Sequence, residues 1–108
     1  MTEQIKGIAE TREVYIGNQR LDPAPSLKVF NHSPDGWNWG YGGSGPSQLA
    51  LGILLFLTDD IEFATANYQD FKWEVIAGIQ QGQDFTLDVG DVQMWIYKKK
   101  ELEFERGS

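Results

Sequence analysis

The sequence of 108 residues contains no cysteine and only one histidine, His32. Without cysteine, disulfide frameworks, thiolate zinc sites, iron–sulfur clusters and cysteine nucleophiles are excluded. With a single histidine, a metal site would need mostly oxygen ligands. We therefore expect no metal and no other cofactor.

Basic residues are also scarce. The chain has nine Lys and Arg against sixteen Asp and Glu, which gives a net charge of −7. Nonspecific nucleic-acid binding depends on cations that neutralise phosphates, so this balance makes nucleic acid an unexpected partner. The one basic run is 98–100. The carboxylates are scattered, which favours a role in solubility over a surface that mimics DNA.

No long hydrophobic run is present. The longest, Leu49–Leu57, has nine residues, whereas a membrane-spanning helix needs about 20. Met1–Glu13 is polar and carries three acidic residues, unlike an export signal. Hydrophobic residues still make up 41% of the chain, enough for one core. We expect a soluble, single-domain protein of the cytoplasm.

The N-terminal half predicts short strands. Residues 1–12 show no clear period and predict a mobile or loosely docked terminus. Val14–Ile16 is β-branched and aromatic, which predicts a strand. Leu27–Phe30, a turn at 33–36 and the alternating 37–41 predict a hairpin with three aromatic rings on one face. Packing of these rings in the core is favoured over an exposed binding platform.

A glycine-rich turn then leads into an apolar helix. Gly42–Pro46 is followed by Ser47–Leu57, with Pro46 suited to the first helical turn. From Leu49 onward the helix is apolar on every side, so it should be buried all round. Gly52 costs about 1 kcal/mol of helix propensity relative to alanine. We expect another element to approach closely at that position.

A second helix should follow, beginning with Asp59 and Glu62 in a capping box. Its apolar face has helical spacing and consists of Ala64, Tyr68, Phe71, Val75 and Ile79. Asp70, Lys72 and Glu74 fall away from that face, so we expect them in solvent.

The last element has two interpretations. Residues 85–96 alternate around Gly90 and Asp91 as in a hairpin, or Asp88 caps a helix that places Val89, Val92 and Ile96 on one face. We favour the helix. The predicted fold is α+β: a short antiparallel meander of two or three strands, then three helices, the first one buried. Residues 13–98 form the domain, and 99–108 an exposed tail that ends in Gly-Ser, a pair typical of cloning remnants.

Three stretches carry a family resemblance. WGYGGSGPSQLALGILL, YQDFKWEVIAGI and VQMWI occur in this order between Val14 and Ile96. The chain thereby resembles a family of small uncharacterised domains from bacteria and their phages and plasmids. The resemblance implies this order of elements and a mobile-element origin, and it implies no mechanism.

The glycine-rich turn is a candidate ligand site. Backbone N–H groups at a helix start attract anions, and Gly42, Gly43 and Gly45 permit close approach, with hydroxyls from Ser44 and Ser47. The pattern matches neither the P-loop nor the dinucleotide fingerprint. A structural role, turning the chain sharply into a buried helix, is favoured over a phosphate or nucleotide site.

No catalytic constellation can be identified. His32 is typical of a hydrogen-bonded loop histidine, and helix capping explains the cluster at 59–62. The favoured hypothesis is a non-catalytic interaction protein that binds a protein partner. Its candidate contact residues are Trp37, Trp39 and Trp73. The alternative is a small-molecule, phosphate or nucleotide binder that uses the glycine-rich turn.

Overall fold

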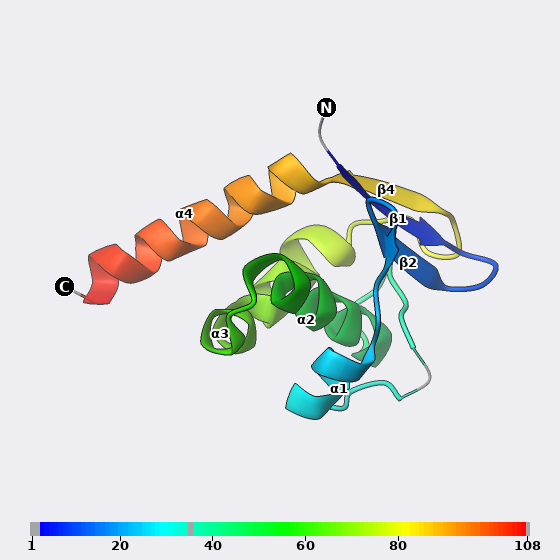
Figure 1. Ribbon diagram of the computed structural model, residues 1–108, viewed down its shortest axis with the longest axis horizontal. Helices are drawn as coiled ribbons and strands as arrows, with labels where there is room; N and C mark the ends of the chain where they lie inside the picture. The colour runs from blue at the N-terminus through cyan, green and yellow to red at the C-terminus, as the bar shows by residue number, and fades with distance from the viewer. Residues whose placement is uncertain (1–2, 35, 108) are drawn as a thin grey trace.

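The computed structural model describes residues 3–34 and 36–107, and Asp35 of the predicted turn lies outside them. The elements are β1 (Gln4–Ile8), β2 (Glu13–Ile16), β3 (Gln19–Arg20), α1 (Ala24–Val29), α2 (Ser44–Thr58), α3 (Ile61–Phe71), the π-helical turn η1 (Lys72–Ile76), β4 (Phe85–Asp88) and α4 (Val89–Gly107). The sheet lies to one side of the helices, and α4 runs from it past α2 and α3 (Figure 1). The chain is therefore α+β, as predicted.

The sheet has four antiparallel strands in the order β3-β2-β1-β4. Alternate side chains of β1 and β2 face the core, so Ile5, Val14 and Ile16 are buried, as expected of a sheet with one covered face. β4 joins β1 from the far end of the chain, with Gly7 opposite Phe85. Of the predicted strands, only Val14–Ile16 lies in this sheet, so the prediction of two or three strands missed β1, β3 and β4.

The expectation of a loosely docked N-terminus is wrong for β1. Gln4–Ile8 lies between β2 and β4, and pairs with both. The reason is its composition: only Ile5 and Ile8 are large apolar residues, so a half-buried strand is hard to recognise without its neighbours. Gly7 has no side chain because the Phe85 ring occupies that space.

The predicted hairpin of 27–30 with 37–41 is wrong. Ala24–Val29 forms the short helix α1, which begins after Pro23 and contains Pro25 in its first turn, a position that tolerates proline. Residues 37–39 have no regular secondary structure and 40–41 form a bend, so the segment joins no sheet within the described chain. The turn itself is present, since the Gly36 N–H donates to the carbonyl of Ser33.

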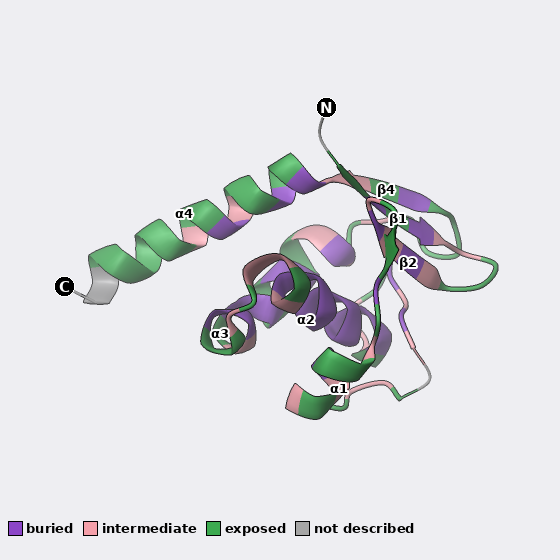
Figure 2. Cartoon of the chain, in the orientation of Figure 1, coloured by how far each residue is buried: buried purple, intermediate pink, exposed green. Residues whose placement is uncertain are grey.

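Helix α2 is the centre of the core, as predicted. Every residue from Gly45 to Leu54 is buried, which Figure 2 shows as a purple helix surrounded by other elements. The helix contacts α1, α3 and η1. The first residue, Ser44, is exposed, and exposure returns at the C-terminal end, where Phe56 is 38% exposed.

Another part of the chain does approach closely at Gly52, but it is the aromatic ring of Trp37 and not the backbone of a helix or strand. An added Cβ would lie 2.7 Å from Cη2 of Trp37, which is itself buried. Replacing Gly52 with alanine gains about 1 kcal/mol of helix propensity but overpacks the core at a cost of about 1–3 kcal/mol. We expect the free energy of unfolding, measured with urea, to fall by about 1 kcal/mol.

Gly78→Ala is the matched control, because a Cβ there would meet only the carbonyl oxygen of Val75 at 3.8 Å. We expect it to leave stability unchanged or to raise it slightly. If Gly52→Ala stabilised the protein as much as Gly78→Ala, the tight contact with Trp37 would be disproved.

Helix α3 begins one residue later than predicted. The cap is Asp60, whose carboxylate accepts the Phe63 N–H at 3.0 Å, while Asp59 ends α2 in the left-handed region. The predicted apolar face is confirmed for Ala64, Tyr68 and Phe71, which are buried, whereas Val75 and Ile79 lie beyond α3 and are only partly buried. The next turn is the π-helix η1, which widens the helix and changes which side chains face inward.

The final segment contains both a strand and a helix. Phe85–Asp88 forms β4 and pairs with β1, and α4 starts directly after it. The Asp88 carboxylate accepts the Gly90 N–H at 2.7 Å, which confirms the predicted cap. Val89, Val92 and Ile96 are buried on one face, also as predicted. No helix in the described part of the chain is long and apolar enough to cross a membrane.

The predicted tail, 99–108, continues α4 as far as Gly107. Residues 100–105 are exposed, but the segment is not detached from the domain. The Asn67 side-chain amide of α3 donates to Glu103 at 2.7 Å, and the Lys100 ammonium lies 5.2 Å from the centre of the Phe63 ring. The compact domain therefore extends past residue 98.

Candidate protein-binding surface

The glycine-rich turn is closely packed by rings and side chains. A Cβ at Gly42 would meet the Trp73 ring at 2.1 Å, one at Gly43 the Tyr41 ring at 2.4 Å, and one at Gly45 the Cβ of Asn38 at 2.6 Å. Packing therefore explains why each of these three positions is a glycine. The rest of the turn consists of Ser44, which is exposed, and Ser47, which is buried. Phosphate or nucleotide binding here stays a prediction.

Of the three tryptophans proposed as partner contacts, two lie in the core. Trp37 is buried against Gly52. Trp39 is 1% exposed, donates from Nε1 to the carbonyl of Gln83 at 2.8 Å, and packs edge-on against Phe85. Only Trp73, 62% exposed on η1, can reach a partner without a conformational change.

Lys72 is buried, contrary to its prediction as a solvent residue. Only 6% of it is exposed. Its ammonium donates to the Gly42 carbonyl at 3.3 Å and lies 4.4 Å from the centre of the Trp73 ring. The π-helical turn carries this side chain inward, and its contacts tie η1 to the glycine-rich turn.

His32 belongs to a polar and aromatic cluster. Its Nε2 lies 2.7 Å from the Tyr68 hydroxyl, and Phe30 packs against both rings. Gln48, fully buried in α2, fixes the same loop, since its carbonyl oxygen accepts the N–H groups of His32 and Ser33. These contacts are those of a hydrogen-bonded loop histidine.

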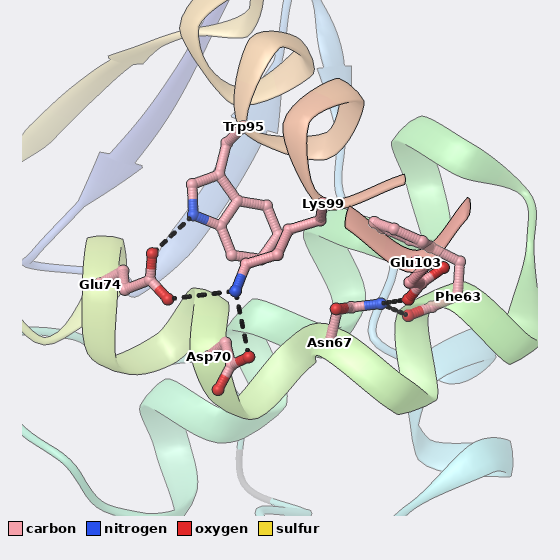
Figure 3. Close-up of polar contacts among 7 residues, drawn as sticks. All are labelled: Phe63, Asn67, Asp70, Glu74, Trp95, Lys99 and Glu103. Atoms are coloured by element: carbon pink, nitrogen blue, oxygen red, sulfur yellow. Dashed lines mark hydrogen bonds and ion pairs between the residues drawn. The ribbon is translucent and has the colours of Figure 1, made fainter. Parts of the chain in front are cut away.

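Helix α4 is held against α3 and η1 by a row of polar contacts (Figure 3). Lys99 donates to Asp70 at 3.1 Å and approaches Glu74 at 3.5 Å, while Trp95 Nε1 donates to Glu74. Partial burial acts to lower the pKa of Lys99, but hydrogen bonds and charge from the two carboxylates outweigh it, so the pKa is raised. These contacts fix α4 and leave its outer face in solvent.

A groove opens between α1 and the C-terminal half of α2, and we call it the α1–α2 groove. It has a volume of about 530 Å³ and is lined by Gln19, Leu21, Asp22, Pro25, Ser26, Val29, Gly52, Leu55, Phe56, Asp59 and Ile61. Phe56 and Ile61 are large, apolar and 38% and 62% exposed. Apolar side chains that face solvent around a hollow are typical of a binding surface.

The groove has an acidic rim. Asp22 and Asp59 line it and are exposed, and a second hollow begins at the next residue, Asp60, with Glu62 and Glu103 in its lining. Among residues 3–34 and 36–107, no three His, Asp or Glu side chains are arranged to hold a metal ion. Asp60 caps α3, so helix capping explains that member of the predicted cluster.

Sequence reasoning did not find this groove. A signal existed at Ile61, which continues the apolar spacing of α3 three residues before Ala64. The helical period places Ile61 on the face of α3 that packs in the core. Because Ile61 is the first residue of the helix, its side chain is nevertheless 62% exposed. Recognising that requires the position of α1, where the residue pattern at 27–30 predicts a strand.

Comparison with protein families matches residues 5–98 to a family of unknown function, DUF6166. No curated protein matches the chain, and no solved structure does. The family match begins inside β1 and ends within α4, so it spans the sheet, the groove and the helices around the core.

Proposed function

Because this chain belongs to DUF6166, a family of unknown function, we propose a function from its own surface: it is a non-catalytic interaction protein that binds a protein partner through the α1–α2 groove. The observation that carries the proposal is an apolar hollow of about 530 Å³ with Phe56 and Ile61 exposed beside it. Aromatic and aliphatic anchors around a concave site supply most of the binding energy in many interfaces.

The resemblance to small domains of bacteria, phages and plasmids supports a finer proposal. The protein is of mobile-element origin and acts in the cytoplasm by blocking a host or competitor protein. A chain without cysteine has no disulfide to lose in that reducing compartment. The support for the blocking role is an analogy with other small acidic proteins of such origin.

Substitutions at the groove test the proposal. A partner captured from a bacterial lysate is purified, and its affinity for the chain is measured by titration calorimetry. We expect Phe56→Ser and Ile61→Ser each to weaken binding by about tenfold or more, since removing a buried anchor costs about 1.4 kcal/mol or more. Both side chains are exposed in the free protein, so the variants should fold.

Trp73→Ser is the matched control, because it removes an exposed ring on η1 that does not line the groove. Circular dichroism and thermal unfolding verify that all three variants are folded. A partner whose affinity falls with Trp73→Ser and not with the groove variants would overturn the proposed groove and assign the contact to η1. Capture alone, without this pattern of variants, would not support the proposal.

A further inference from the structure

Negative charge gathers where α2 ends and α3 begins. Asp22 and Asp59 line the α1–α2 groove, and Asp60 and Glu62 follow along the chain. No Lys or Arg belongs to the lining of the groove or of the adjacent hollow, among the described residues. Of the cations on β3 and α1, Arg20 is paired with Glu13 at 3.3 Å, and Lys28 is exposed outside the groove lining.

The end of α2 itself adds to this negative potential. A helix C-terminus carries partial negative charge and is stabilised by a cation in its last turn. The last turn of α2 contains no basic residue, and its C-cap is Asp59, with φ 50° in the left-handed region. Glycine or asparagine usually occupies such a cap. A carboxylate at this position therefore opposes the stability of the unbound chain.

An external cation would relieve this repulsion. A Lys or Arg from another molecule, placed at the mouth of the groove, would meet the carboxylates of Asp22 and Asp59 together with the terminal carbonyls of α2. The lining of the groove also includes the more buried apolar side chains of Leu21, Val29 and Leu55. The surface thus offers an apolar trough with a negative rim.

We infer that the partner segment in the α1–α2 groove is a basic amphipathic helix, which places apolar side chains between α1 and α2 and sets Lys or Arg against Asp22 and Asp59. This inference rests on the proposed function, because it names the chemistry of the partner at the same groove. Helices that bind in grooves present anchors at spacings of three and four residues. The flanking positions of such a helix are free to carry the cations.

Two designed peptides test the inference directly. Both have Leu and Phe at helical spacing on one face, and they differ only in carrying Lys or Glu at the flanking positions. We expect fluorescence anisotropy at low salt to show the Lys peptide binding at least tenfold more tightly than the Glu peptide, with the difference shrinking as salt rises. Phe56→Ser should lower the affinity of the protein for the Lys peptide.

Asp59→Asn separates a binding role from a structural one. The variant removes the charge that opposes the helix dipole and supplies a residue suited to the left-handed cap, so we expect its melting temperature to rise by about 2–5 °C. The same variant should bind the Lys peptide about two- to fivefold more weakly. Combined with Asp22→Asn, which keeps the oxygen that accepts the Ala24 N–H, the loss should reach about tenfold.

Glu10→Gln provides the charge control, since it removes one carboxylate in the turn between β1 and β2 and does not line the groove. It should leave peptide affinity unchanged. Equal binding of the two peptides, lost in Phe56→Ser, would overturn the inference and leave the groove as the partner site. Failure of the Lys peptide to bind would also overturn it, whereas failure of the proposed function appears separately, as a partner insensitive to Phe56→Ser and Ile61→Ser.

Discussion

Replacing Gly40 with alanine is expected to lower the free energy of unfolding by about 2–5 kcal/mol. Gly40 has φ 84°, a region that costs an L-residue about 1–2 kcal/mol. In addition, a Cβ would lie 2.5 Å from the backbone N and Cα of Gln81 and 2.6 Å from the carbonyl oxygen of Ile79. Backbone atoms cannot rotate away, so the chain must shift and overpacking adds about 1–3 kcal/mol.

The effect is measured by urea unfolding followed by tryptophan fluorescence. Gly82→Ala is the matched control, because Gly82 has a similar φ of 75° but nothing within 4 Å of an added Cβ. It should cost only the backbone strain of about 1–2 kcal/mol. Similar losses of unfolding free energy in both variants would disprove the tight contact between Gly40 and the backbone of residues 79–81. Next to this contact, the Gly40 N–H donates to the carbonyl of Ile76 at 3.1 Å.

Replacing Gln48 with leucine is expected to cost about 3–5 kcal/mol. Gln48 is fully buried, and its amide satisfies four groups of the α1 region: it accepts from the N–H of His32 and Ser33 and donates to the Ser26 hydroxyl and the Phe30 carbonyl. Leucine of similar size removes all four hydrogen bonds, and a buried group left unsatisfied costs about 1–3 kcal/mol. The Ser26 hydroxyl keeps its bond to the Pro23 carbonyl. Chemical unfolding of the purified variant measures the loss.

Gln48→Glu provides a second measurement with a pH signature. Burial should raise the pKa of the introduced carboxyl in the folded state above the unfolded value of about 4.3. Stability would then be greatest below that pH, where the neutral acid keeps one donor and one acceptor. It should fall by up to about 1.4 kcal/mol per pH unit as pH rises toward the folded pKa. A variant with the same pH dependence as the unchanged chain would show that Gln48 is not sealed from water.

The groove variants Phe56→Ser and Ile61→Ser should behave differently from both of these. Their side chains are exposed, so truncation should change stability little while changing affinity for a partner. Gly40 and Gln48 instead act on the internal packing: Gly40 lies tightly against the backbone near residue 81, and Gln48 holds the loop after α1. Loss of partner binding in Gln48→Leu would therefore follow from loss of the groove wall.

Several features follow from the local sequence because their causes are local. The run from Leu49 is apolar on all sides, and no position other than the centre of the core satisfies such a helix. The cap at Asp88 and the buried face of Val89, Val92 and Ile96 depend on spacing within one helix. The acidic balance of the chain is likewise a property of its composition.

Other features depend on which segments meet. β1 is a strand because β2 and β4 provide its hydrogen bonds, and its own residues carry too few apolar side chains to predict it. The alternation at 37–41 has the period of a strand, but Trp37 and Trp39 enter the core from an irregular segment that joins no sheet in the described chain. Lys72 is buried because a π-helical turn rotates it toward Gly42.

The sequence by itself therefore determined the α+β class, the buried helix and the apolar faces at the start of α3 and of α4, since helical and strand periods act within a few residues. Only the tertiary structure decided the strand order, the short helix α1 and the existence of the α1–α2 groove. That groove is assembled from β3, α1, α2 and the start of α3. No pattern along the chain records its shape, because its walls come from segments whose contacts form only when the chain folds.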